Sequence, residues 1–383
     1  MRRCAWALLF AALLGPGGPA SAQGLRLQID GPAQVMFTPS QGCDGNDIPD
    51  APARVFRAPD NSLVMFGLHD TNRAFRGPDL DHMKLDCGVV LASPGNADPA
   101  AYDDHSWITA LFTRDGRHVS ALIHHEYHGN EHEGACRFTS MMACWYNTIL
   151  EAASSDSGRH FQHQASAVVA SVPFRADAFQ GRHRGFFNPS NIVPWHGAAY
   201  FMASTTGWQG QPGGVCLFKS RTPEIAGSWR AIDGHGFAAD FPDPYRHKVS
   251  MTTHCQVIAP FPAPVGALVR LRGTHEFLAI FMAKRDDRLF PVSGFYYAAG
   301  KDLLHWGLPH LLLAGATYYD DPCSTGGQVI AYPSLIDPQA KSRIFADSGA
   351  SPWLYYTSAR VKGCTITSAR DLLRRRLAVQ GAP

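Results

Sequence analysis

Short apolar runs separated by polar turns cover the chain from residue 23 to its C-terminal end. Most of these runs are bounded by Gly, Pro, Asp or Asn, and apolar residues rarely recur at helical spacing. Short strands with regularly placed turn residues are typical of all-β sandwiches, barrels and propellers. Two segments have a helical pattern, Ser368 to Leu377 and, more weakly, Thr139 to Ala143. The pattern therefore predicts an all-β protein with little helix.

The clearest local element is a hairpin within residues 103–128. An apolar run over residues 107–112 is followed by the turn Arg-Asp-Gly-Arg at 114–117 and by a second apolar run at 119–123. Asp-Gly between two alternating apolar runs is a strong hairpin signal. The second strand continues into His-His-Glu-Tyr-His at 124–128. Because side chains alternate along a strand, one face is expected to carry His124, Glu126 and His128.

Repetition over a longer range favours a propeller. Asn188-Pro189-Ser190 opens one unit, Tyr332-Pro333-Ser334 opens another, and about four strands per unit match a propeller blade. The N-terminal segment Leu25 to Phe37 can complete the last blade. We predict a single five-bladed β-propeller domain over residues 23–383, with two β-sandwiches as the alternative. The blades are expected at residues 50–95, 104–165, 184–235, 250–308 and 328–379.

These units resemble the five-bladed β-propeller glycoside hydrolases of families 43 and 32 and their relatives. The resemblance is carried by the blade openings at 188–193 and 332–336, each followed by an aromatic strand at 200–203 or 354–357. It implies a carbohydrate-active protein whose acids stand on the innermost strands around the axis. The three acids of these families are not matched at the expected places, which hold Asp60 in a turn, Asn188, and His254 or Cys255.

The first 22 residues have the pattern of a signal peptide. Arg2 and Arg3 precede an apolar run over residues 5–14, and Ala20-Ser21-Ala22 fits a cleavage site. The run is shorter than the roughly 20 residues that a membrane span needs, and no later stretch is long and apolar enough to span. We therefore expect cleavage after Ala22 and a secreted or periplasmic protein without a membrane span.

Cysteines and charge restrict the compartment and the partners. Eight cysteines remain after residue 22, an even number that predicts disulfides in an exported protein, and their order suggests pairing between sequential neighbours. Loss of Arg2 and Arg3 lowers the formal charge from +2 to 0. A protein without net positive charge has no global field that attracts nucleic acid, so no nucleic-acid partner is expected.

The densest group of titratable residues surrounds Glu126, which is the leading catalytic candidate. Neighbouring imidazoles are expected to tune its pKa, and Asp104 is the candidate for the second acid of a pair. The alternative for Asp104 is an Asx turn before a strand. Imidazole and carboxylate are common metal ligands, so His124, Glu126 and His128 could also hold a metal ion.

The remaining candidates are polar or aromatic side chains suited to a sugar. His69, Asn72 and Arg73 follow an expected strand at residues 63–67, and Trp208 lies among glycines as a stacking platform for a sugar ring. The predicted substrate contacts are His69, Asn72, Arg73, His124, His128, Asn188, Trp208 and His254. The sequence thus favours a glycoside-hydrolase-like enzyme with a non-standard acid set. The alternative is a non-catalytic glycan-binding or structural propeller without the catalytic acids.

Overall fold

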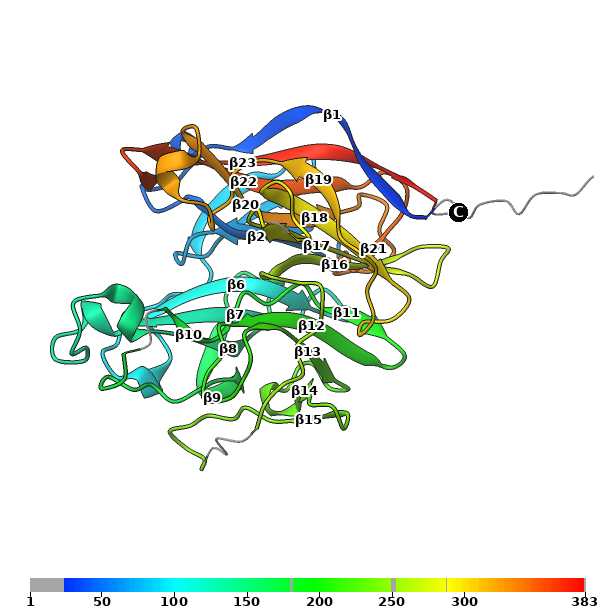
Figure 1. Cartoon of the computed structure of the whole chain (residues 1–383). Helices are drawn as coiled ribbons and strands as arrows, with labels where there is room; N and C mark the ends of the chain where they lie inside the picture. The colour runs from blue at the N-terminus through cyan, green and yellow to red at the C-terminus, as the bar shows by residue number, and fades with distance from the viewer. Residues whose placement is uncertain (1–23, 180–181, 249–252, 287, 382–383) are drawn as a thin grey trace, which may run out of the picture.

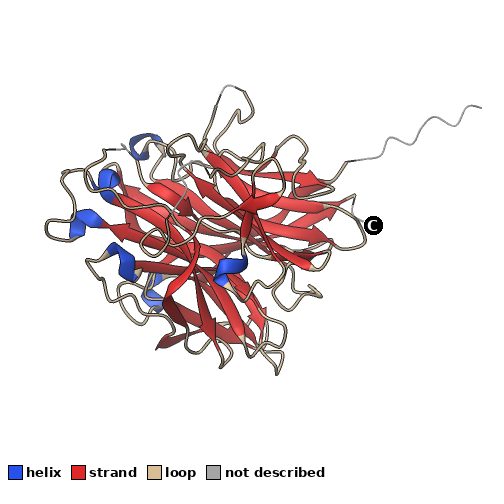
Figure 2. Cartoon of the chain, turned by 90° about the horizontal axis from the view of Figure 1, so that it is seen from below, coloured by secondary structure: helices blue, strands red, loops and turns tan. Residues whose placement is uncertain are grey.

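The computed structural model describes residues 24–179, 182–248, 253–286 and 288–381. These residues form β-strands joined by loops and short 3-10 turns, and no α-helix is present among them. The turns lie in the connections between strands (Figure 2). The predicted all-β class is confirmed. The predicted signal peptide, residues 1–22, lies outside the described residues, and within these no helix has the length and hydropathy of a membrane crossing.

The first strand group is a four-stranded antiparallel sheet in the order β2-β3-β4-β5. It follows the 3-10 turn η1 (Pro39–Gln41), and its strands are β2 (Pro49–Arg57), β3 (Leu63–Leu68), β4 (Arg73–Gly77) and β5 (Lys84–Val89).

The second group is antiparallel in the order β6-β7-β8-β9 and contains the predicted hairpin. Asp115 Oδ1 accepts the backbone N–H groups of Arg117 and His118 in the hairpin turn, so the Asp-Gly prediction is confirmed. The strands are β6 (His105–Phe112), β7 (Val119–His128), β8 (Trp145–Ser154) and β9 (Gln162–Ala170). The 3-10 turns are η2 (Pro99–Ala101), η3 (Gly129–Glu131) and η4 (Met141–Cys144).

The third group is joined to the second, because β10 pairs in parallel with β8 and the two groups form one ten-stranded sheet. Gly185 makes this contact, and a Cβ there would lie 1.9 Å from the carbonyl oxygen of Asn147. Its strands are β10 (Arg184–Phe187), β11 (Val193–Trp195), β12 (Ala198–Thr205), β13 (Gly214–Ser220), β14 (Arg230–Ile232) and β15 (Phe237–Ala239), with the 3-10 turn η5 (Ala226–Ser228).

The fourth group is antiparallel in the order β19-β18-β17-β16, with β21 (Asp347–Ser348) added in parallel at β16. The predicted range 250–308 is shifted, since the strands occupy residues 265–314 and the described part of 250–264 contains no strand. The strands are β16 (Val265–Leu271), β17 (Phe277–Ala283), β18 (Gly294–Gly300) and β19 (His310–Ala314).

The fifth group joins the two ends of the chain in the order β20-β22-β23-β1. β1 runs beside β23 with Arg26 opposite Gln380, so the N-terminal segment joins the last strand group (Figure 1). The helix predicted at Ser368 to Leu377 is wrong, because these residues lie within β23. The strands are β20 (Gln328–Ile336), β22 (Trp353–Lys362), β23 (Thr365–Gln380) and β1 (Arg26–Phe37). The 3-10 turn η6 (Pro322–Ser324) precedes β20.

The groups contact one another through a few of their strands and through a buried arginine. β2 lies against β6 and β20, and β16 lies against β20 and β12. Arg54 on β2 is 4% exposed and donates hydrogen bonds to Thr109 O, Pro189 O and Ser334 Oγ. One guanidinium of the first group therefore reaches the second, third and fifth groups.

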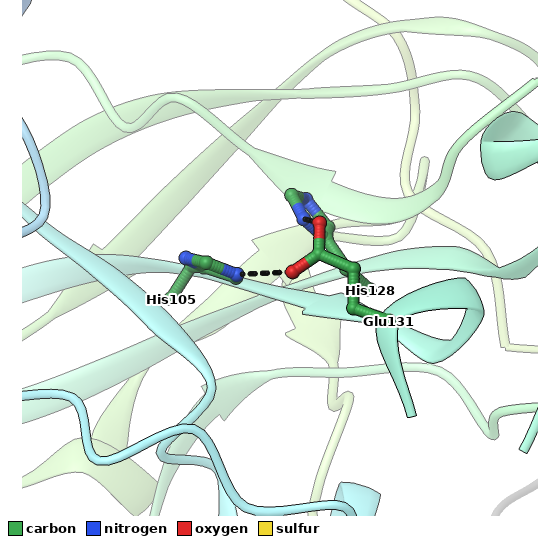
Figure 3. Close-up of side chains that lie close together, drawn as sticks. All are labelled: His105, His128 and Glu131. Atoms are coloured by element: carbon green, nitrogen blue, oxygen red, sulfur yellow. Dashed lines mark hydrogen bonds and ion pairs between the residues drawn. The ribbon is translucent and has the colours of Figure 1, made fainter. Parts of the chain in front are cut away.

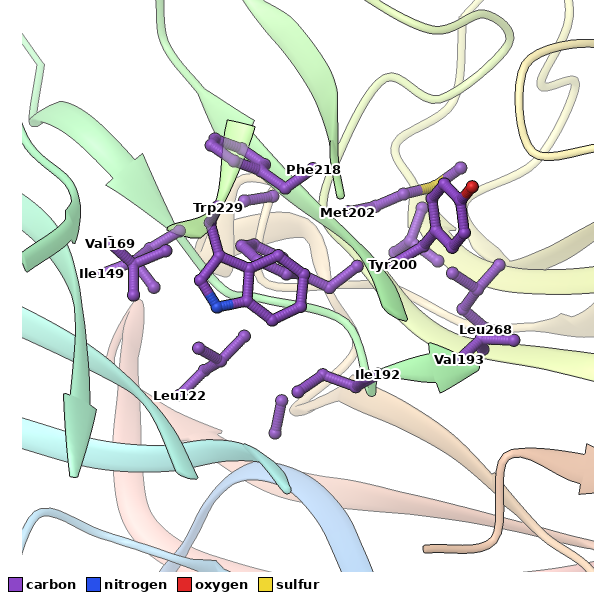
Figure 4. Close-up of a cluster of buried hydrophobic side chains, with 14 of the residues drawn as sticks. Leu122, Ile149, Val169, Ile192, Val193, Tyr200, Met202, Phe218, Trp229 and Leu268 are labelled. Carbon is purple, nitrogen blue, oxygen red and sulfur yellow. The ribbon is translucent and has the colours of Figure 1, made fainter. Parts of the chain in front are cut away.

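Apolar side chains fill the space between neighbouring groups. In the largest core cluster Trp229 packs edge-on against Phe201, and residues of β7, β8 and β9 face residues of β12 and β13 (Figure 4). Such burial is the main favourable term in folding.

Disulfides connect sequential cysteines, as the order of the cysteines suggested. The pairs are Cys43–Cys87, Cys136–Cys144, Cys216–Cys255 and Cys323–Cys364. They include all eight cysteines that follow residue 22.

Candidate active site

A cavity of about 210 Å³ lies where the five strand groups meet. Every group contributes to its wall, from β2 of the first group to β20 of the fifth. Its polar lining residues are Asp50, His124, Glu126, Asn147, His183 and Asn188, and its apolar and aromatic ones are Trp107, Trp145, Phe187, Met282, Tyr318, Tyr319 and Tyr332.

The repeated Pro-Ser motif places two of these residues. Asn188 and Tyr332 both precede Pro-Ser and have φ angles of 50° and 54°. Left-handed backbone is uncommon for residues other than glycine and is often found at functional sites. The serine Oγ atoms fix the motif to the backbone, because Ser190 Oγ accepts the N–H of Met202 and Ser334 Oγ donates to Ala53 O.

Glu126 projects from β7 into the cavity with its side chain 12% exposed. Its Oε2 lies 3.0 Å from His128 Nε2, and its Oε1 lies 3.3 Å from His124 Nε2. Burial acts to raise the pKa of Glu126, but the His128 hydrogen bond and the charges of His124, His128 and His183 hold this pKa below its ordinary value. Glu126 is therefore held in the ionised form.

Asp50 is the second carboxyl in the cavity and lies on β2 with its side chain 14% exposed. Its Oδ1 contacts the guanidinium of Arg370 and accepts from Tyr332 OH at 3.2 Å, while its Oδ2 lies 3.5 Å from His69 Nε2. Burial raises the pKa of Asp50 above its usual value, although Arg370 and His69 oppose this increase. The two cavity acids thus have pKa values that are shifted in opposite directions.

Several buried polar atoms of the cavity wall have no hydrogen-bond partner within the described protein. They are Trp107 Nε1, Trp145 Nε1, Asn147 Oδ1, His183 Nε2 and Tyr318 OH. Buried polar groups in native proteins are usually paired, so these five atoms are available to hydrogen-bond to water or to a polar group that enters the cavity.

A continuous series of alternating carboxylates and imidazoles connects the two acids outside the cavity. From Asp50 it passes through His69, Asp70 and His105 to Glu131, with nitrogen–oxygen distances of 3.5, 2.5, 2.7 and 3.2 Å. It then returns through His128 to Glu126 at 3.1 and 3.0 Å. Each imidazole in the series contacts carboxylates through both of its nitrogens.

The structure brings some predicted site residues together. Glu126, His124 and Asn188 line the cavity, and His69 and His128 contact its acids. Asp104 does not line it, since its Oδ2 accepts the backbone N–H of His128 and its Oδ1 lies 3.1 Å from His132. The expected partnership of Asp104 with Glu126 is therefore corrected, because Asp104 lies with His125 and Tyr127 on the other face of the hairpin.

The other predicted substrate contacts are used within the fold. Asn72 bonds the backbone of Ser106 and Ile108, and Arg73 pairs with Asp44 and Asp47. Trp208 and His254 line a different, smaller cavity. Their predicted contact with a substrate beside Glu126 is corrected by these positions.

The sequence did not reveal Asp50, Trp107 or the tyrosines of the cavity wall. The signal that could have revealed Asp50 is its place at the start of the first strand of its group, where the resembled families carry an acid. The tryptophans lie beside the histidines that the hairpin revealed, since Trp107 on β6 is opposite His124 and Trp145, the first residue of β8, is opposite His128.

The predicted metal ligands His124, Glu126 and His128 form an ion-pair cluster, in which both imidazoles face the same carboxylate. Among the described residues, metal-ligating atoms converge in a neighbouring set, His105, His128 and Glu131 (Figure 3).

Comparison with known proteins gives similarity to solved structures only. No protein-family model and no curated protein sequence matches the chain. A Cellvibrio cellulosa α-L-arabinanase complexed with arabinohexaose is 11% identical, with 86% of this chain and 91% of that chain covered and a TM-score of 0.47. An N-acetylgalactosamine deacetylase from F. plautii in complex with blood group B trisaccharide is 14% identical, with coverages of 94% and 96% and a TM-score of 0.47. A GH43 β-1,3-galactosidase is 12% identical, with coverages of 86% and 60% and a TM-score of 0.44. Family 43 enzymes, which the sequence motifs resemble, are thus among the similar structures.

Proposed function

We propose that this protein is an exported, carbohydrate-active propeller that hydrolyses a glycosidic bond in its central cavity. The observation that carries the proposal is the presence of two carboxyls, Asp50 and Glu126, in one cavity whose wall also contains six Trp, Tyr and Phe side chains. Aromatic faces stack on sugar rings, and a pair of carboxyls is the usual equipment for glycoside hydrolysis.

The five strand groups would be the blades of this propeller. The contacts of β2 with β6 and β20, those of β16 with β12 and β20, and the three-way hydrogen bonding of Arg54 support a shared axis. β1 would close the ring by completing the fifth blade with β23. A cavity at the axis of such a ring receives one or more side chains from every blade.

The two acids would divide the chemistry. Glu126, held ionised by its imidazole partners, takes a proton from the attacking water. Asp50, with its raised pKa, gives its proton to the leaving oxygen as the bond from that oxygen to the anomeric carbon breaks. The donors Trp107 Nε1 and Trp145 Nε1 would bind sugar hydroxyls.

The test compares wild type with Glu126→Gln and Asp50→Asn on a panel of arabinan, galactan and other glycan substrates. Each variant keeps its shape and loses its titratable proton, so turnover should fall by about 10²–10⁴ with little change in melting temperature. Glu133→Gln, an exposed acid beyond the cavity, is the matched control and should keep full activity. An active wild type whose Glu126→Gln variant is equally active would overturn the proposal.

Non-catalytic glycan binding is the second candidate, and the internal bonding of both acids favours it. Asp50 and Glu126 each have charged partners within the protein. In this case wild type would be inactive on every substrate but would bind glycans, and Trp107→Ala would abolish binding while Glu126→Gln would retain it.

Export is supported by the four disulfides, which form in oxidising compartments. The proposal also follows from the signal-peptide pattern at residues 1–22. A carbohydrate is the proposed partner.

A further inference from the structure

The side chains of His105, His128 and Glu131 converge beside the central cavity (Figure 3). His105 opens β6, His128 ends β7, and Glu131 reaches back from the 3-10 turn η3. Glu131 Oε2 lies 3.2 Å from His105 Nε2, and Glu131 Oε1 lies 3.1 Å from His128 Nδ1. One ligand atom from each of the three residues lies within 4.8 Å of the other two, so a single ion can bind all three side chains.

In both imidazoles the outer nitrogen, which is the ring nitrogen that does not contact Glu131, lies beside another carboxylate. His105 Nδ1 lies 2.7 Å from Asp70 Oδ2, and His128 Nε2 lies 3.0 Å from Glu126 Oε2. Histidines that bind a metal usually donate their other N–H to such a group, which fixes the tautomer and orients the ring. The arrangement therefore supplies both the inner ligands and the outer supports of a metal site.

The number of hydrogen-bond donors on an imidazole gives a further reason to expect a cation at this place. A neutral imidazole carries one N–H and one lone pair. If the outer nitrogens donate to Asp70 and Glu126, the inner nitrogens of His105 and His128 turn lone pairs toward the carboxylate of Glu131. Two lone pairs and a carboxylate repel one another unless a proton or a cation lies between them.

The backbone around the three residues is fixed. Asp104 accepts the N–H of His128 at the end of β7, which holds the backbone of this ligand in place. The disulfide Cys136–Cys144 closes the loop that follows η3. Glu131 has its side chain 48% exposed, which leaves one side of the site open to water.

We propose that His105, His128 and Glu131 bind one divalent transition metal ion of the Zn²⁺ type. Two imidazoles and a carboxylate suit such an ion better than Mg²⁺ or Ca²⁺, which prefer oxygen ligands. The ion would be joined to the cavity through His128, whose other nitrogen contacts Glu126. The proposal does not depend on glycan hydrolysis, because metal binding is measured without a substrate.

The test uses full-length mature protein without a polyhistidine tag, treated with a chelator and titrated with Zn²⁺ by calorimetry. Wild type should bind one equivalent and gain melting temperature. Glu131→Gln and His105→Gln should each weaken binding by at least 10–100-fold, and Asp70→Asn, which removes an outer support, by about 10–100-fold. His82→Gln removes an exposed imidazole that is paired only with Asp79 and is the matched control.

The result that overturns the proposal is a wild type that takes up no Zn²⁺, or Zn²⁺ binding of equal strength in wild type, Glu131→Gln and His105→Gln. In either case the cluster consists of protonated imidazoles that form ion pairs with the carboxylate of Glu131. If His105→Gln does not fold, the half-exposed position of Glu131 makes Glu131→Gln the deciding variant.

Discussion

At the scale of single residues, a position at the end of a strand was not enough to predict that a polar side chain faces the cavity. Some side chains at strand ends bond to the backbone of a neighbouring strand group. Asn72 donates to Ser106 O and accepts from Ile108 N–H, which fastens the first strand group to the second. Asn191 makes the same pair of bonds to the backbone of Leu268. Polar residues at strand ends are therefore used here to satisfy the backbone between neighbouring groups, a demand that buried peptide groups impose.

Glu151 shows how burial acts on a residue outside the central cavity. It lies on β8, is 7% exposed and accepts from Ser120 Oγ at 2.9 Å in a groove shared with His118, Asp156, His160 and Glu224. Burial raises the pKa of Glu151 to about 7; the charge of Glu224 adds to the increase and the Ser120 hydrogen bond opposes it.

A pH-dependent stability difference follows for Glu151→Gln. Because the folded pKa lies above the ordinary value of 4.5, the stabilisation from the neutral carboxyl is complete below that pH and is lost as pH rises through about 7. Glutamine keeps an acceptor for Ser120 and does not titrate. In urea unfolding, the free energy of unfolding of the variant relative to that of wild type should increase from about pH 5 to about pH 8, by up to on the order of 3 kcal/mol. A difference that stays constant with pH would contradict this, and Glu133→Gln is the control.

At the scale of elements, β23 shows tertiary pairing overriding local propensity. Leu, Arg and Ala favour a helix in isolation, which is why Ser368 to Leu377 was predicted as one. In the fold this segment pairs with β22 on one side and β1 on the other. The buried Arg374 stacks on Trp353 at 4.1 Å. Strand preference depends on such neighbours more than on the residues themselves.

The contribution of β1 can be measured with one buried residue. Leu27 is 5% exposed in the core cluster that contains Leu377 and Val379 of β23. Leu27→Ala should lower the free energy of unfolding by about 2–5 kcal/mol. Gln28→Ala, on the exposed face of the same strand, should change it by less than about 0.5 kcal/mol. Equal effects of the two substitutions in denaturant titrations would show that β1 is not part of the cooperative unit.

At the scale of the whole molecule, the strand groups are joined by contacts between distant parts of the chain. β1 and β23 bring the described ends together, and Arg54 connects three strand groups besides its own. Each disulfide, by contrast, joins neighbouring cysteines, with sequence separations between 8 and 44 residues. The cross-links thus stabilise individual regions, while packing and hydrogen bonds connect the strand groups to one another.

Export predicts the covalent state of the mature protein. Its intact mass should correspond to a chain that begins at Gln23 and contains four disulfides, and thiol titration of the unfolded, unreduced protein should detect almost no free cysteine. Retention of Met1 would contradict cleavage after Ala22, and several titratable thiols would indicate a reducing compartment or a different role for the cysteines. Reduction followed by titration is the control and should release all eight thiols.

The sequence by itself determined the all-β class, the hairpin at residues 105–128, the pairing of β1 with the last strand group and the cluster of ionisable residues around Glu126. These features are local, or they repeat along the chain, so alternation and turn residues were enough to predict them. Only the tertiary structure decided that Asp50 shares a cavity with Glu126, that Asp104 lies on the other face of the hairpin, and that Trp208 and His254 lie elsewhere. A cavity wall is assembled from strands far apart in sequence, and the direction of a side chain depends on register and on packing between groups. Neither quantity is encoded in the spacing of residues along one strand.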